Sequence, residues 1–159
     1  MKPPKNNRGA KGFVCVNKYK SIWSLGLTPD VELIRTSVFV DEQGFAAVGV
    51  VFDELESSSL NIVLYENDVP IGTGRLVQEN STDFRIGRVA ILSSRRKSGD
   101  GARLMSLMEE KAISLGARKI LLSAQSHTLG FYKKCGYSIV SDEYVIHGCP
   151  HVDMEKDVG

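Results

Sequence analysis

Short apolar runs rich in branched and aromatic side chains recur along the chain, and polar or glycine-containing segments separate them. Runs of this composition and length are typical of strands. The turn Asn67-Asp68 joins the run over 60–65 to the run over 69–76, which predicts a hairpin. In all, we expect strands over residues 13–19, 60–65, 69–76, 84–92, 119–124, 137–140 and 151–154.

Helical spacing is found in three segments between these runs. Residues 102–115 place their apolar side chains on one broad helical stripe, and Gly116 is suited to end that helix. Residues 28–30, Thr-Pro-Asp, are typical of a helix start, and this helix should reach about residue 39. A short helix is expected around Phe131, and residues 43–51 should form a loop or short helix that lines a site. The pattern predicts an α+β fold, a mixed sheet of about six or seven strands flanked by helices.

The length of 159 residues is enough to bury one ordinary core. We expect residues 1–11 to be a disordered basic tail and residues 12–159 to form a single domain. The formal net charge of +1 gives no electrostatic case for a nucleic-acid partner. No apolar run is long enough to span a membrane, and the basic start lacks the apolar core of a secretion signal, so no membrane association is expected.

The cysteines Cys15, Cys135 and Cys149 are scattered and odd in number. This favours reduced thiols and therefore a cytoplasmic protein, with the nucleus as the alternative. His147 and His151 flank Cys149, but their spacing does not match that of metal ligands, so we expect no metal. Both a monomer and a homodimer are compatible with the sequence.

A glycine-containing loop over residues 96–102 lies between the strand over 84–92 and the following helix. Gly99 and Gly101 let the backbone approach a ligand, and the first helical turn leaves N–H groups unpaired. Such a terminus binds anions, phosphates above all, and Arg96 and Lys97 add positive charge. The G-x-x-x-x-G-K-[ST] string of nucleotide hydrolases does not occur, and Leu104 replaces the third glycine of the dinucleotide fingerprint.

The spacing of Arg96, Gly99 and Gly101 resembles the R-x-x-G-x-G coenzyme loop of the GNAT N-acetyltransferases. Residues 131–137, FYKKCGY, look like that family's F-Y-x-x-x-G-[FY] signature. Residues 35–43, RTSVFVDEQ, look like the R-x-x-V-F-V-x-E-Q segment of its ElaA-like branch. Other markers of this branch are similar to residues 87–89, 124–127 and 148–154, so the matches run in order along most of the chain.

This resemblance implies the GNAT fold and the transfer of an acetyl group from acetyl-CoA, as co-substrate, to a primary amine that attacks the thioester directly. It implies that the loop backbone holds the coenzyme's pyrophosphate and that N–H groups of the preceding strand polarise the thioester oxygen. Tyr132 is implied as the acid that protonates the leaving thiolate, with a core tyrosine as the alternative. The coenzyme-binding residues are then Val89, Ala90, Ile91, Arg96, Lys97, Ser98, Gly99, Asp100, Gly101, Ala102, Gln125 and Tyr132.

Two loop residues depart from the family pattern. Lys97 stands where many members have glycine. Asp100 places a negative side chain inside an anion-binding loop, so we expect it to point to solvent or to weaken binding.

The mechanism also needs a base, because an alkyl amine is mostly protonated at neutral pH. Glu42 ranks first as the catalytic base, since it lies in the matching segment on the expected acceptor side. A solvated carboxylate and an ion pair with Arg35 are the alternatives for Glu42. His151 and His127 rank next, and a water relay without a single base residue is a further route.

The acceptor is expected to be held by Gln43, Arg88 and His151, with Asp53 as an additional candidate. Gln43, Arg88 and Asp53 are equally compatible with a structural role, and for His151 on its late strand a core histidine is the favoured alternative. We favour a small molecule that carries a primary amine. A protein lysine or N-terminus is the second acceptor class. The third hypothesis is a sensor that binds acyl-CoA without turnover.

Overall fold

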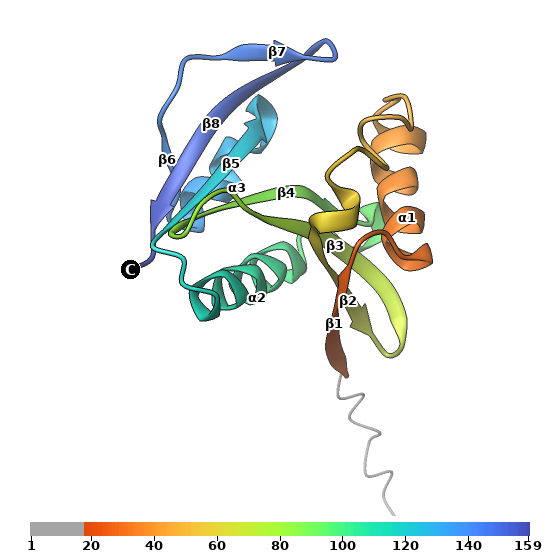
Figure 1. Cartoon of the computed structure of the whole chain (residues 1–159). Helices are drawn as coiled ribbons and strands as arrows, with labels where there is room; N and C mark the ends of the chain where they lie inside the picture. Colours follow the sequence, from red (N-terminus) through yellow and green to blue (C-terminus); the bar gives the residue numbers. More distant parts are fainter. Residues whose placement is uncertain (1–17) are drawn as a thin grey trace, which may run out of the picture.

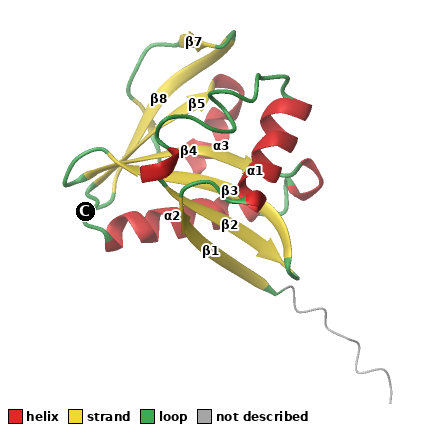
Figure 2. Ribbon diagram, turned by 45° about the vertical axis from the view of Figure 1, so that its right-hand side comes forward, coloured by secondary structure: helices red, strands yellow, loops and turns green. Residues whose placement is uncertain are grey.

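The computed structural model describes residues 18–159 (Figures 1 and 2). Its strands are β1 (Tyr19–Leu25), β2 (Leu60–Glu66), β3 (Val69–Gln78), β4 (Asp83–Ile91), β5 (Lys119–Gln125), β6 (Ser138–Ile139), β7 (Tyr144–Ile146) and β8 (Cys149–Asp157). Its α-helices are α1 (Pro29–Arg35), α2 (Asp100–Ser114) and α3 (Leu129–Lys134). A π-helical segment, Thr36–Glu42, continues α1, and 3-10 turns lie at Glu56–Ser58, Ser93–Arg95 and Ser126–Thr128.

The strands form one sheet in the order β1-β2-β3-β4-β5-β8-β6, with β7 paired to β8. Every pairing is antiparallel except that of β4 with β5. These two parallel strands, connected by a crossover through α2, pair only from Asp83 opposite Lys119 to Arg85 opposite Leu121. Beyond that point they separate, and β5 and β8 rise away from β4 in Figure 1. The sheet is therefore split where the carboxyl ends of β4 and β5 diverge.

Helices cover both faces of the sheet, as the alternation of side chains along β2 demonstrates. Ile62 and Leu64 join the hydrophobic cluster that contains the buried α2 residues, whereas Val63 joins the cluster that contains the buried residues of α1. The apolar stripe of α2 contributes Leu104 and Met108, both fully buried, to the first cluster. The mixed sheet with flanking helices is the α+β fold that the sequence predicts.

The predicted elements differ from the observed ones mainly in number and at the N-terminal side. The hairpin over 60–76 is confirmed, and Asn67 and Asp68 have φ values of 50° and 66°, as a two-residue turn of this hand requires. The strand expected over 13–19 lies almost wholly outside the described residues, as does the tail over 1–11, and β1 begins at Tyr19. The sheet has eight strands rather than six or seven, because the three-residue β7 is too short to give a sequence signal.

No helix in the part of the chain that the structure describes has the length and apolar character needed to cross a membrane.

Candidate active site

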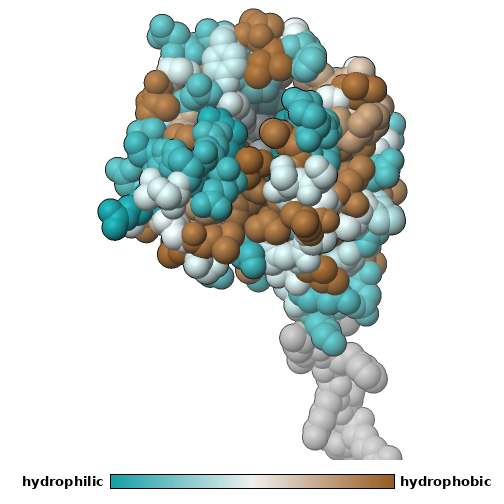
Figure 3. Space-filling model, viewed as in Figure 1, coloured by the Kyte–Doolittle hydropathy of each residue, from teal (hydrophilic) through white to brown (hydrophobic). Residues whose placement is uncertain are grey.

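A cavity of about 340 Å³ lies in the cleft where β4 and β5 diverge. The molecular surface is hollowed between the β7–β8 region and the α1 side (Figure 3). The cavity wall brings together six residues that sequence analysis assigned to coenzyme or acceptor: Gln43, Arg88, Val89, Gln125, Tyr132 and His151. The split sheet thus joins segments that are far apart in the sequence at one concave site.

A β-bulge interrupts β4 beside this cavity. Two β4 residues, Arg88 and Val89, occupy the place opposite the single residue Gly74, and Arg88 has a φ of 50°. A bulge leaves one residue outside the hydrogen-bond ladder, and β4 has no pairing with β5 beyond Arg85. Val89 lines the cavity, whereas the Ala90 side chain is buried in the α1-side cluster. The backbone at the bulge is consequently suited to bind a ligand oxygen at the cavity wall.

The N-terminus of α2, next to the bulge, has features that suit anion binding. Gly99 precedes the helix with a φ of 83°, and no side chain of the described residues caps this end. The first backbone hydrogen bond of the helix runs from the Arg103 N–H to the Gly99 carbonyl at 3.1 Å. Among residues 18–159 the N–H groups of Asp100, Gly101 and Ala102 have no hydrogen-bond acceptor. Free N–H groups at the positive end of a 15-residue helix are suited to hold a phosphate.

Gly101 connects the coenzyme loop to the second sequence motif. A Cβ atom at this position would lie 3.0 Å from Cε2 of Phe131, the first residue of the F-Y signature. A Cβ at Gly99 would meet nothing within 4 Å, so there the positive φ is what favours glycine. The absent side chain of Gly101 thus lets α3 pack closely against α2.

Asp100 does not point to solvent, contrary to the sequence prediction. The residue is 1% exposed, and its carboxylate accepts hydrogen bonds from the Tyr19 hydroxyl at 3.0 Å, Arg95 Nε at 3.1 Å and the Ser98 hydroxyl at 2.8 Å. Burial alone raises the pKa of Asp100, but these hydrogen bonds hold it below the ordinary value. Arg95 pairs with Asp100 and also with Glu66, so an ion pair and two hydroxyl hydrogen bonds hold the buried carboxylate of Asp100 in this loop.

Tyr132 lies on α3 with its half-buried ring beside the cavity. Its ring makes edge contacts with Phe131, at 5.0 Å between centroids, and with Tyr137, at 6.2 Å. Burial, and after it the nearby Cys135, raises the pKa of the Tyr132 hydroxyl far above neutrality. The group is therefore protonated at neutral pH and is suited to donate a proton rather than to remove one.

Glu42 and Arg96, assigned to base and coenzyme respectively, bind each other. Both guanidinium end nitrogens of Arg96 donate to the Glu42 carboxylate, the Nη2 bond measuring 2.9 Å. Hydrogen bonding by Arg96 lowers the pKa of Glu42. Glu42 is not among the residues that line the cavity, and these two findings argue against a base role. The alternative that Glu42 pairs with Arg35 is wrong, because Arg35 binds Glu56.

Arg96 also donates from Nη2 to the Ile91 carbonyl at 3.0 Å, so it fixes the loop against the end of β4. Lys97, with a φ of 66°, and Ser98 are exposed in the same loop. The loop residues implied by the resemblance therefore lie together around the α2 terminus.

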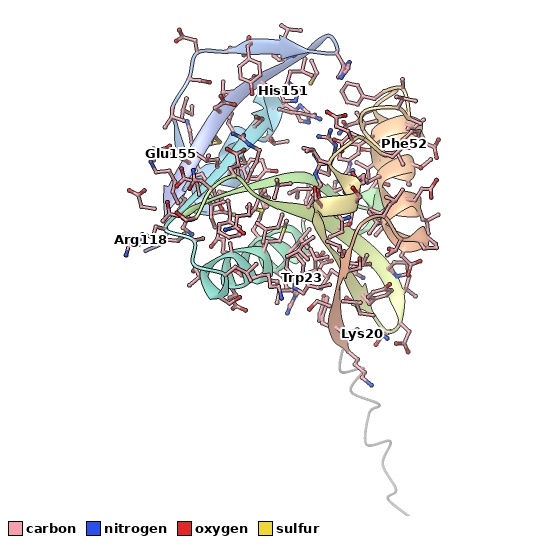
Figure 4. All side chains as sticks on the ribbon, viewed as in Figure 1. Lys20, Trp23, Phe52, Arg118, His151 and Glu155 are labelled. Carbon is pink, nitrogen blue, oxygen red and sulfur yellow. The ribbon has the colours of Figure 1, made fainter. Side chains whose placement is uncertain are left out.

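His151 lies on β8 at the edge of the cleft (Figure 4). Its Nδ1 is 2.7 Å from the Cys149 carbonyl oxygen, which can only accept, so Nδ1 carries the proton. In the neutral ring Nε2 is then the free acceptor. The ring stacks on Tyr144 at 6.1 Å, which restrains its orientation. His127, the other histidine considered, is exposed and does not line this cavity.

Two contacts close one side of the cavity. Gln125 Nε2 donates to Gln43 Oε1 at 3.0 Å, which joins the end of β5 to the end of the π-helical segment. Phe45 makes an edge contact with His147 at 6.4 Å between ring centroids. All four side chains line the cavity, so the segment after Glu42 and the β7–β8 hairpin share its wall.

Comparison with known proteins identifies the family. Residues 38–158 match the family described as the acetyltransferase (GNAT) domain. The chain belongs to the GNAT family. The Bacillus subtilis protein YjcF, named as an uncharacterised N-acetyltransferase, is 37% identical over 129 residues, which are 80% of this chain and 91% of that protein. Escherichia coli ElaA is 29% identical over 79% of this chain and 84% of its own length.

Solved structures agree with this assignment. A crystal structure from Lactobacillus plantarum has a TM-score of 0.80 at 32% identity, covering 89% of this chain and 99% of that chain. The crystal structure of Escherichia coli ElaA has a TM-score of 0.75 with the same coverage of both chains. The GNAT fold and the GNAT-type N-acetyltransferase class implied by the resemblance are thus confirmed.

Behind this cavity lies a buried polar cluster that the sequence did not reveal. Arg35 is 0% exposed and donates to Glu56 at 2.6 Å, to the Val51 carbonyl at 2.8 Å and to Asn61 at 2.8 Å. Asn61 in turn donates to the Gly26 carbonyl at 2.8 Å. The cluster fastens α1 and the segment before β2 to the sheet.

The cluster continues to the cavity wall through Arg75 and Arg88. Arg75 Nη1 donates to Asp53 at 2.8 Å and to Glu56 at 2.9 Å. Arg88 Nη2 donates to the Gly49 carbonyl at 2.6 Å and to Asp53 at 3.3 Å. Asp53, considered as an acceptor ligand, therefore acts as a bridge between two arginines. A charged residue inside the apolar run of β3 is the one signal by which the sequence could have exposed Arg75.

Within the described residues, no three histidine, cysteine, aspartate or glutamate side chains are grouped so as to hold a metal ion.

Proposed function

We propose that this GNAT protein transfers the acetyl group of acetyl-CoA to a primary amine of a small molecule. The observation that carries the proposal is that the backbone bulge at Arg88 and Val89 and the side chain of Tyr132 line one cavity. The α2 terminus adjoins this site, because Gly101 packs against Phe131, the neighbour of Tyr132 in the chain. The cavity volume of about 340 Å³ lies within the range of small-molecule sites, which favours a small acceptor over a protein segment.

The residues at the α2 terminus fit the pyrophosphate of coenzyme A. Three N–H groups lack a partner there among the described residues, and Lys97 is exposed beside them. An aminoglycoside 6′-N-acetyltransferase that shares this fold, with a TM-score of 0.66 at 19% identity, was solved with coenzyme A. When bound, acetyl-CoA would supply the thioester carbon that the amine attacks.

The chain's own groups then manage charge and protons. Backbone N–H groups at the Arg88–Val89 bulge would bind the carbonyl oxygen as negative charge develops on it, and such a donor contributes about 3 kcal/mol. A carbon–nitrogen bond forms and the carbon–sulfur bond breaks. His151 Nε2 takes the proton from the amine, and the Tyr132 hydroxyl gives its proton to the departing sulfur.

We propose His151 as the base in place of Glu42. His151 lines the cavity with a free Nε2, whereas the Glu42 carboxylate is held by Arg96 outside it. The sequence could not rank the two in this order, because the ranking depends on which side chain reaches the cavity.

Replacing His151 by glutamine should lower kcat/KM by about 10²-fold, because the cavity then lacks a ring nitrogen that can take the amine proton. Steady-state kinetics with one amine acceptor would measure the loss. His127→Gln is the matched control, since that exposed histidine lies outside the cavity. An unchanged kcat/KM in His151→Gln together with a large loss in Glu42→Gln would restore Glu42 as the base.

The proposed function is tested by calorimetric titration with acetyl-CoA, followed by a thiol-release assay over a panel of amines. Gly101→Asp should weaken acetyl-CoA binding at least tenfold, about 1.4 kcal/mol, because it adds negative charge at the anion site and crowds Phe131. Gly101→Ala adds the crowding alone, so comparing the two variants isolates the charge. Thiol release that depends on an added amine would support the proposed acetyltransferase activity of the native protein.

Other outcomes of the same assay decide against parts of the proposal. Unchanged affinity in Gly101→Asp would contradict the loop assignment. Binding without thiol release would favour an acyl-CoA sensor. Faster turnover of lysine-containing peptides than of free amines would favour a protein acceptor.

We propose further that residues 12–159 act as one catalytic domain in the cytoplasm, with the nucleus as the alternative compartment. The described cysteines, Cys135 and Cys149, are free thiols, which is in keeping with a reducing compartment. The active unit is a monomer or a homodimer.

A further inference from the structure

The polar cluster behind the cavity carries unequal numbers of opposite charges. Its ionised members are Arg35, Arg75, Arg88, Asp53 and Glu56, connected through the hydrogen bonds described above. An arginine guanidinium stays protonated in proteins, so three cations meet two carboxylates. One positive charge in this cluster is therefore not balanced by the cluster itself.

The unbalanced charge lies at Arg88. Arg35 and Arg75 each have a carboxylate oxygen within 2.8 Å. Arg88 reaches one carboxylate of the described residues, that of Asp53, at 3.3 Å and through a nitrogen that also bonds the Gly49 carbonyl. Among residues 18–159, Nη1 and Nε of Arg88 have no hydrogen-bond partner, and its side chain is 30% exposed into the cavity that it lines.

The electrostatics of the site agree with this placement. Burial, and after it the charge of Arg75, lowers the pKa of the Arg88 guanidinium, whereas the charge of Asp53 raises it. Two other arginines line the same cavity. Arg75 is paired with Asp53 and Glu56, and Arg85 is paired with Glu79, which also lines the cavity. Arg85 and Glu79 thus form a neutral pair, and Arg88 remains as the cation available to a ligand.

We propose that the acceptor is an amine that also carries a carboxylate or a chemically similar anionic oxygen group, which binds Arg88. This inference rests on the proposed function. A partly buried cation with free donors gains a charge-assisted hydrogen bond from such a group, and an acceptor without it leaves the cation uncompensated. The coenzyme phosphates do not fill this role, because their site is the α2 terminus, whereas Arg88 is fastened to Gly49 and Asp53.

Amine pairs that differ only in the anionic group provide the test. Lysine is compared with 1,5-diaminopentane and β-alanine with ethylamine, by thiol release at saturating acetyl-CoA. We expect the carboxylate-bearing member of a pair to have a KM at least tenfold lower. Arg88→Gln should remove this difference by raising the KM of that member alone, and Arg88→Lys should keep part of it. Aminomethylphosphonate tests whether a phosphate-like group serves in place of the carboxylate.

The double variant Glu79→Gln, Arg85→Gln is the matched control, because it removes a neutral pair from the same wall and should preserve the KM ratio. Equal KM values within each pair, or an unchanged ratio in Arg88→Gln, would overturn the inference while leaving the acetyltransferase proposal intact. Absence of turnover with every amine would instead remove the proposed function. The inference would then stand only if calorimetry detects binding of lysine or β-alanine that Arg88→Gln abolishes, and it fails if neither binds.

Discussion

Replacing Tyr132 by phenylalanine should lower kcat about 10²-fold or more while the dissociation constant for acetyl-CoA changes by less than about twofold. The hydroxyl lies at the cavity, has no hydrogen-bond partner among the described residues, and burial keeps it protonated. Its loss removes a proton donor and leaves the ring, which packs between Phe131 and Tyr137, in place. Steady-state kinetics and calorimetric titration of the same preparation would separate the two effects.

Tyr137→Phe is the matched control for this prediction. Tyr137 belongs to the same aromatic cluster, but its hydroxyl donates to Glu109 at 3.0 Å and the residue does not line the cavity. We expect this variant to lose some stability and to retain its kcat. A kcat for Tyr132→Phe equal to the native value across the pH profile would remove Tyr132 from the mechanism. Equal losses in both variants would assign the effect to packing.

The strand–loop–helix unit of the proposed coenzyme site is encoded in the local pattern of the sequence. Branched residues predict β4, the stripe of apolar residues predicts α2, and Gly99 marks the left-handed position between them. Each of these signals depends on only a few neighbouring residues, so it can be recognised in the sequence without knowledge of the fold. The confirmed hairpin at Asn67 and Asp68 is local in the same sense.

Interactions between distant residues could not be predicted in this way. Glu42 and Arg96 are 54 positions apart, and Tyr19 and Asp100 are 81 apart. Which carboxylate meets which cation depends on how β1, the π-helical segment and the loop are placed by the sheet. The sequence therefore placed Asp100 in the proposed anion-binding loop but did not predict Tyr19 as its hydrogen-bond partner. For Glu42 it suggested Arg35 as an ion-pair partner, whereas the structure pairs Glu42 with Arg96.

Replacing Glu56 by alanine should lower the free energy of unfolding by about 3–5 kcal/mol and the melting temperature by about 10 °C. One oxygen of Glu56 accepts from Arg35 at 2.6 Å and from Arg75 at 2.9 Å, and both arginines are buried. Without it, two guanidinium groups lose a charge partner away from water, while the Nε atoms of both are already buried without an acceptor. Thermal and urea unfolding would measure the loss.

Glu56→Gln distinguishes the loss of charge from the loss of a hydrogen-bond acceptor, because the amide keeps an oxygen at the same position. We expect the melting temperature of Glu56→Gln to lie between those of the native protein and Glu56→Ala. Replacing the exposed Glu54 by alanine should leave the melting temperature unchanged. Since Arg35 holds the Val51 carbonyl and the cluster continues to Arg88, Glu56→Ala should also raise the KM of the acceptor more than that of acetyl-CoA. A native melting temperature in Glu56→Ala would mean that solvent or Asp53 compensates both arginines, and the cluster would then not be what holds the acceptor wall in place.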